Sequence, residues 1–153
     1  MAAKRERIQP EKLHVRKDGE KVLYSQVMVV EVGGARQIFV AGQTPRDKHG
    51  NCVGKGDMRA QIEQVGENIK DALEAAGATL ADIVKTTTYV TDMEEYFKHQ
   101  DVRMRYFAQA IPTSTTVQVS RAADVCRTCL RSAPPSIAVL TERQPRMPLA
   151  PEQ

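Results

Sequence analysis

The clearest pattern in the chain is an apolar stripe with helical spacing that follows Asp57. Apolar side chains recur every three or four residues, which places them on one face of a helix: Met58, Ile62, Val65, Ile69, Ala72, Leu73 and Ala76. The other face is expected to carry Gln61, Glu63, Gln64, Glu67, Lys70 and Glu74. Asp57 can cap the first turn and Gly77 can end the last one. The stripe predicts a long amphipathic helix that needs a sheet or another helix to cover it.

The segments on both sides of this helix resemble β-strands. Tyr24–Val32 and Gln37–Ala41 flank Gly33-Gly34, which is a typical two-residue hairpin turn. Ile83–Val90 is rich in β-branched residues and predicts a third strand. Shorter strands are predicted at Leu13–Lys17, Thr115–Val119 and Ile137–Leu140.

A second helix is predicted to begin at Asp92, because Asp92 and Glu95 have the spacing of a capping box, and to end before Pro112. We interpret its apolar side chains as core: Met93, Tyr96, Phe97, Val102, Tyr106 and Phe107. The simplest arrangement places both helices on one face of a mixed sheet. The chain would then leave the other face uncovered, so we expect self-association into a closed ring of subunits.

The composition fits one globular domain. The chain has 153 residues, of which 41% are apolar and 27% charged, enough for a core. We expect a loose N-terminus at 1–12, a single domain at 13–141 and a disordered, proline-containing tail at 142–153. No apolar run approaches the roughly 20 residues of a membrane span, and the first residues lack the apolar segment of a secretory signal. A cytoplasmic protein with no membrane partner is expected.

Charge and cysteine content argue against several classes of partner. The net charge is +3 without a dense basic run, and aromatic residues make up only 5%, which disfavours nucleic-acid binding. Cys126 and Cys129 form a lone CxxC, whereas His14, His49 and His99 are scattered. A structural zinc site needs four ligands. We therefore predict neither a metal nor another cofactor, and expect reduced thiols.

Several segments, in their order and spacing, resemble the YjgF/Rid family of enamine and imine deaminases, some of which carry the older label L-PSP endoribonuclease. They are Tyr24-Ser-Gln26, Ile38–Gln43, Asn68–Ala78, Asp82–Thr87, Val90–Met93, Tyr106-Phe107 and Pro112–Val117, and they lie between Tyr24 and Arg121. The resemblance implies a chorismate-mutase-like α/β domain that forms a homotrimer and binds a small molecule in clefts between subunits. In the family, an Arg pairs with the carboxylate of a 2-imino or 2-enamino acid and a late Glu positions the attacking water.

This sequence departs from the family pattern at both of those positions. Ser114 stands where the Arg is expected, and losing such a contact costs on the order of 1.5–3 kcal/mol or more. No equivalent of the late Glu is readable between Asp124 and Leu140. Either a divergent loop or a locally shifted reading frame accounts for residues 122–136. The resemblance leaves the catalytic residues unassigned and gives Tyr24, Gly42, Gln100, Ser114 and Thr116 as substrate-binding candidates.

Three hypotheses follow. The first is a Rid-like trimer that binds or hydrolytically deaminates a small enamine or imine, such as a 2-aminomuconate-type compound. The second is a non-catalytic module that binds a small ligand or a partner and has kept the trimer. The third, an endoribonuclease, has the least support because the sequence lacks a general base beside a cation. Arg103 or Arg105 of the second helix could supply a cation, although helical arginines are mostly solvated.

Overall fold

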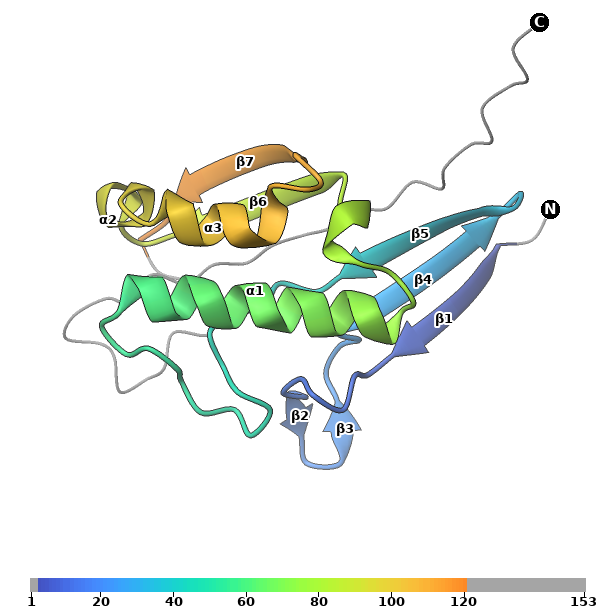
Figure 1. Cartoon of the computed structure of the whole chain (residues 1–153). Helices are drawn as coiled ribbons and strands as arrows, with labels where there is room; N and C mark the ends of the chain where they lie inside the picture. The colour runs from blue at the N-terminus through green and yellow to red at the C-terminus, as the bar shows by residue number, and fades with distance from the viewer. Residues whose placement is uncertain (1–2, 121–153) are drawn as a thin grey trace, which may run out of the picture.

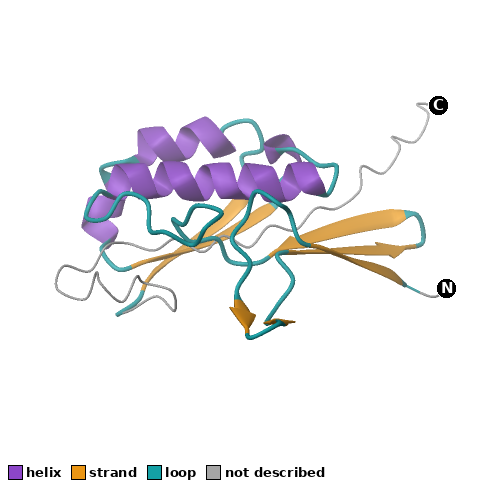
Figure 2. Cartoon of the chain, turned by 90° about the horizontal axis from the view of Figure 1, so that it is seen from below, coloured by secondary structure: helices purple, strands orange, loops and turns teal. Residues whose placement is uncertain are grey.

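The structure is a computed structural model that describes residues 3–120. Its helices form one layer over a layer of strands (Figures 1 and 2), so the predicted α+β arrangement with the helices on one face is confirmed. The elements are, in chain order, β1 Lys4–Ile8, β2 Lys17–Asp18, β3 Lys21–Val22, β4 Val27–Val32, β5 Ala35–Val40, α1 Met58–Ala75, the 3₁₀ helix η1 Leu80–Asp82, β6 Lys85–Val90, α2 Met93–Phe97, α3 Gln100–Phe107 and β7 Thr113–Gln118.

Helix α1 begins and ends where its sequence signals predict. The Asp57 carboxylate accepts a hydrogen bond from the Ala60 amide at 3.1 Å. Gly77 follows the last turn with a φ of 69°, and its amide donates to the Glu74 carbonyl at 2.9 Å. Every residue of the predicted apolar stripe is buried. Local capping and the helical period together account for this element.

One residue assigned to the polar face of α1 is buried instead. Gln61 is only 1% exposed, and its Nε2 donates to the Gly54 carbonyl at 2.6 Å. The side chain thus ties the loop before α1 to the helix. Helical periodicity assigns a polar residue to solvent and contains no information about a tertiary partner, so the prediction for Gln61 was wrong.

The β4–β5 hairpin forms around Gly33-Gly34 as predicted. Its inner face packs under the helices: Val29 lies opposite Ile38, as Val27 does opposite Val40, and all are almost fully buried. Alternation places Val32 and Phe39 on the face turned away from the helices, where they are 48% and 39% exposed. The chain therefore leaves apolar side chains uncovered on the outer face of this sheet.

The N-terminal residues are more ordered than predicted. Lys4–Ile8, expected to be loose, forms β1 and pairs antiparallel with β4. The strand lies at the edge of the sheet with mostly exposed side chains, so it has no apolar alternation to reveal it. The expected strand at Leu13–Lys17 is largely irregular: Leu13 packs into the core, and only Lys17–Asp18 pairs, with Lys21–Val22.

The second helix is interrupted. Asp92 caps α2 through the Glu95 amide at 2.9 Å, as predicted, but α2 ends at Phe97 and α3 begins at Gln100. The interruption breaks the single apolar stripe. Phe97 is 57% exposed, contrary to its assignment to the core, whereas Tyr96, Val102 and Phe107 are buried.

Strands β6 and β7 are parallel, and α2 and α3 form the crossover between them, as parallel pairing requires. The described strands make three ladders, β1-β4-β5, β2-β3 and β6-β7, which include both antiparallel and parallel pairs. The predicted strand Ile137–Leu140, the Cys126–Cys129 motif and the tail lie outside the described residues, so the limits at 141 and 142 stay predictions. Within residues 3–120, no helix combines the length and the apolar character needed to cross a bilayer.

Candidate functional site

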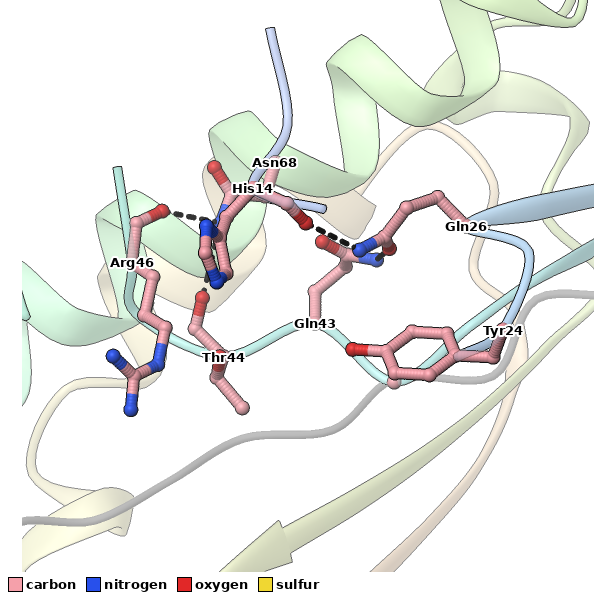
Figure 3. Close-up of a pocket in the computed structure, with 8 residues that line it drawn as sticks. His14, Tyr24, Gln26, Gln43, Thr44, Arg46 and Asn68 are labelled. Carbon is pink, nitrogen blue, oxygen red and sulfur yellow. Dashed lines mark hydrogen bonds between the residues drawn. The ribbon is translucent and has the colours of Figure 1, made fainter. Parts of the chain in front are cut away.

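The candidate residues fall into two groups. Tyr24 and Gly42 line a hollow between the loop before β4, the segment after β5 and α1 (Figure 3). Gln100, Ser114 and Thr116 belong to α3 and β7. We call the first group the Tyr24 hollow, lined by His14, Tyr24, Gln26, Gly42, Gln43, Thr44, Arg46 and Asn68. None of the α3 or β7 candidates is among those lining residues.

Two buried glutamines form the floor of the Tyr24 hollow. Gln26 and Gln43 are 5% and 4% exposed. The Gln43 Nε2 donates to the Gln26 Oε1 at 2.9 Å, and the Gln26 Nε2 donates to the His14 carbonyl at 2.7 Å. Because buried amides are costly to leave unpaired, this chain of hydrogen bonds holds the three segments in one geometry.

Asn68 of α1 fixes the far wall. Its Nδ2 donates to the Thr44 and Arg46 carbonyls at 3.0 Å each, and its Oδ1 accepts from the Gln64 Nε2 at 2.8 Å. The Arg46 guanidinium in turn donates to the Gly50 carbonyl at 2.6 Å. The segment after β5 is therefore attached to the helix by its backbone, and the exposed Gly42 of this segment lines the hollow.

The hollow is small on its own. Its volume is about 20 Å³, which is room for about one water molecule. Tyr24 lies at the rim, 41% exposed, and its ring points toward Gln43 (Figure 3). The described residues therefore supply a polar wall and an aromatic edge, and a metabolite would need further walls.

The second group is centred on the Ser114 hydroxyl. We call it the Ser114 cluster, made of Thr86, Thr88, Tyr96, Gln100, Arg103, Ser114 and Thr116. Parallel pairing sets Ser114 beside Thr86 and Thr116 beside Thr88. The Ser114 Oγ accepts hydrogen bonds from the Thr86 Oγ1 at 3.2 Å and from the Arg103 Nη2 at 3.0 Å. The structure thus places a guanidinium directly beside the residue that replaces the family's Arg.

Helices α2 and α3 cover this cluster with polar groups. Tyr96 is 2% exposed, and burial raises the pKa of its phenol, while the nearby Arg103 charge partly offsets that rise. The side chains of Thr88, Gln100 and Arg103 lie beside the Tyr96 hydroxyl and lower its pKa through hydrogen bonding. The sequence proposes Gln100, Ser114 and Thr116 as candidates and Arg103 as a source of charge, and the structure places these four in one cluster. Tyr96, Thr86 and Thr88 also lie in it, although the apolar stripe and the strand pattern indicated only a structural role for them.

The described residues offer little to a metal ion. Within residues 3–120, no group of three or more His, Cys, Asp or Glu side chains is arranged to hold one. Cys52 is a free, half-buried thiol. The chemistry available at both groups is hydrogen bonding by amides and hydroxyls, with a guanidinium at each: Arg46 in the hollow and Arg103 in the cluster.

Comparison with known proteins shows which family this chain is related to. The family model described as Endoribonuclease L-PSP matches residues 20–127. A RutC family protein of Pyrococcus abyssi is 44% identical over 98 residues, which cover 64% of this chain and 74% of that protein. Protein DfrA of Myxococcus xanthus is 38% identical over 97 residues, covering 63% of this chain and 72% of the relative.

Solved structures agree with the sequence matches. RidA from the Antarctic bacterium Psychrobacter superposes with a TM-score of 0.69 at 26% identity, covering 92% of this chain and 99% of RidA. YyfA of Yersinia pestis, a Rid family protein, superposes with a TM-score of 0.67 at 28% identity, covering 90% and 98%. The chain therefore belongs to the Endoribonuclease L-PSP family, which is the YjgF/Rid family that its motifs indicated.

Proposed function

We propose that the protein is a cytoplasmic homotrimer that binds a small enamine or imine metabolite in clefts between subunits and hydrolyses it to a carbonyl compound and ammonia. One observation carries the proposal: the candidate residues divide between the Tyr24 hollow and the Ser114 cluster, two polar half-sites of which the first is too small alone. A cleft built from the hollow of one subunit and the cluster of the next would unite them.

The uncovered strand faces support such an assembly. Val32 and Phe39 on the outer face of β4–β5 are joined by Val117 on the corresponding face of β7, which is 38% exposed. Leu23, the residue before Tyr24, is 52% exposed. Apolar surface of this kind favours association, because burying it in an interface removes it from water. Copies packed through these faces would bring Tyr24 close to a neighbouring chain.

The reaction needs modest chemistry. Water adds to the C=N carbon of the imine to give a carbinolamine, and the amine then leaves as ammonia while the carbonyl forms. A group that donates a proton to the departing nitrogen and one that accepts a proton from water would accelerate both steps. Hydroxyl groups of Tyr24 and of the Ser114 cluster are our candidates for orienting the substrate and the water.

A non-catalytic binding module is the second candidate. It is favoured by one observation, that Ser114 occupies the position of the family's Arg. An endoribonuclease has weaker support, because the net charge of +3 is spread over the chain without a basic stripe. The two leading functions share the cleft and differ in whether bound substrate turns over.

Ammonia release separates them. The purified full chain is incubated with 2-aminoacrylate, 2-iminobutyrate and 2-aminomuconate, and the rate is compared with spontaneous hydrolysis in buffer. We expect acceleration of at least one substrate, reduced in the Tyr24→Phe variant. No acceleration, together with thermal stabilisation by 2-oxobutyrate, would establish the binding module instead. If the chain shows neither acceleration nor stabilisation, both proposed functions are wrong.

A further inference from the structure

His14 lies on the wall of the Tyr24 hollow and is held there by its backbone. Its carbonyl accepts a hydrogen bond from the buried Gln26 Nε2 at 2.7 Å, and the preceding Leu13 packs into the core. The bond to Gln26 engages neither nitrogen of the His14 ring. In Figure 3, Gln43 lies between the rings of His14 and Tyr24. The backbone thus fixes the position of the residue, and the imidazole is not needed for that.

The loop after β5 is shaped to accept the imidazole. Gly50 has a φ of 86°, and a Cβ built there would lie 2.7 Å from Cε1 and 2.9 Å from Nδ1 of His14. Any other residue at this position would therefore displace the ring. The turn that presents Gly50 is closed by the Asp47 carboxylate, which accepts from the His49 and Asn51 amides at 2.9 Å each. The half-buried ring is therefore packed on one side against backbone.

The charged groups around His14 have partners of their own. The Arg46 guanidinium, which also lines the hollow, donates to the Gly50 carbonyl at 2.6 Å. Lys12, two residues before His14, pairs with Asp71 of α1 at 2.8 Å. Among the residues that line the hollow, His14 is the one whose side chain both accepts and donates a proton near neutral pH. Amides and threonine do not titrate, and phenols and guanidinium groups keep their protons until about pH 10 or above.

The hollow suits a water molecule rather than a metabolite. Its volume is about 20 Å³ and its lining is polar, which are the conditions for an ordered water. Tyr24 also lines a second, open groove of about 420 Å³, together with Leu23 and Met28. A groove of that size can hold a small metabolite. A metabolite in the groove and a water in the hollow would therefore meet at Tyr24.

We propose that the hollow holds the attacking water and that His14 carries its proton during the hydrolysis. The inference deepens the proposed function, on which it rests. Water adds to the C=N carbon and gives a proton to the imidazole, while the C=N electron pair moves to nitrogen. The imidazolium then protonates that nitrogen, which gives the carbinolamine. In the second step the imidazole takes the hydroxyl proton and passes it to nitrogen, so the C–N bond breaks, ammonia leaves and the carbonyl forms with His14 restored.

The test compares ammonia release from the three substrates named above by the full natural chain and by His14→Gln. The variant keeps the carbonyl that binds Gln26 and loses the group that carries a proton. We expect the accelerated rate to fall at least about a hundredfold, as when a general base is removed, with 2-oxobutyrate binding in titration calorimetry unchanged. The loss should shrink at low pH, where a protonated imidazole cannot accept a proton. Added imidazole should restore part of the rate to His14→Ala.

His49→Gln is the matched control, because His49 is exposed, lies in the loop after β5 and does not line the hollow. It should release ammonia at the natural rate, and a thermal melt of each variant checks that folding is unchanged. A natural rate in His14→Gln, a loss that is equal at every pH, or a loss of 2-oxobutyrate binding would overturn the inference and leave the deaminase. No acceleration by the natural chain would remove the deaminase and, with it, the role of His14, so the two failures are distinguishable.

Discussion

Gly66 and Tyr106 offer the sharpest test of how the helix layer is packed. Gly66 is buried in the middle of α1, and a Cβ built there would lie 2.6 Å from Cδ2 and Cε2 of the Tyr106 ring on α3. Tyr106 cannot simply turn aside, because its hydroxyl donates to the Glu67 Oε1 at 3.0 Å. The absence of a side chain at Gly66 therefore allows α3 to approach α1.

Two opposing effects set the magnitude for Gly66→Ala. Replacing glycine by alanine inside a helix normally stabilises it by about 1 kcal/mol. Forcing a methyl group into a filled space costs about 1–3 kcal/mol. We therefore expect Gly66→Ala to lower the free energy of unfolding by about 1 kcal/mol in the natural background. In a Tyr106→Ala background the clash is absent, so the same substitution should raise it by about 1 kcal/mol.

Urea denaturation of the four members of this cycle measures the coupling. All four are unfolded at one protein concentration, because self-association makes stability concentration-dependent. A coupling of about 2 kcal/mol between the two sites is expected. Gly66→Ala as stable as the natural protein, or equal effects in both backgrounds, would refute the proposed close contact.

Three further predictions concern single groups. Asp57→Ala should lower the free energy of unfolding by about 1 kcal/mol in urea, since α1 loses its N-cap, and an unchanged midpoint would contradict the capping role. Asn68→Ala should cost about 2 kcal/mol and accelerate amide exchange after β5, because the Thr44 and Arg46 carbonyls lose their donor; unaltered exchange would count against it. Burial, helped by Glu67, raises the pKa of Tyr106 to about 12 from 10.0. The folded state favours the neutral phenol, so the stability that this group contributes is fully present below pH 10 and is lost as the pH rises through about 12. Over that range the natural protein should lose free energy of unfolding relative to Tyr106→Phe.

The sequence predicted the elements whose signals are local. Helix α1 follows from a regular stripe with a cap at each end, and the β4–β5 turn follows from Gly33-Gly34. It missed β1, because an exposed edge strand is held by the backbone of its neighbour and needs no apolar alternation. It also assigned Gln61 and Phe97 wrongly, because a tertiary hydrogen bond and a helix interruption both override periodicity.

The candidate site shows even more clearly that local sequence patterns do not reveal tertiary contacts. Motif resemblance proposed Tyr24, Gly42, Gln100, Ser114 and Thr116 as candidates, yet it could not say that only the first two line the Tyr24 hollow. Arg103 was one of two helical arginines with similar sequence surroundings. Only the tertiary packing of α3 distinguishes the two: the Arg103 side chain donates to Ser114 of β7, whereas the Arg105 side chain donates to Glu63 of α1.

The central claim is that the two half-sites meet between copies of the chain. Subunit mixing tests it directly: Tyr24→Ala impairs the hollow, Ser114→Leu impairs the cluster, and each variant alone should fail to bind 2-oxobutyrate. After the two are unfolded together and refolded as a mixture, about one quarter of the clefts would combine an intact hollow with an intact cluster. We predict that binding returns at about that fraction of the natural capacity. Mixed assemblies that form and recover no binding would contradict the account.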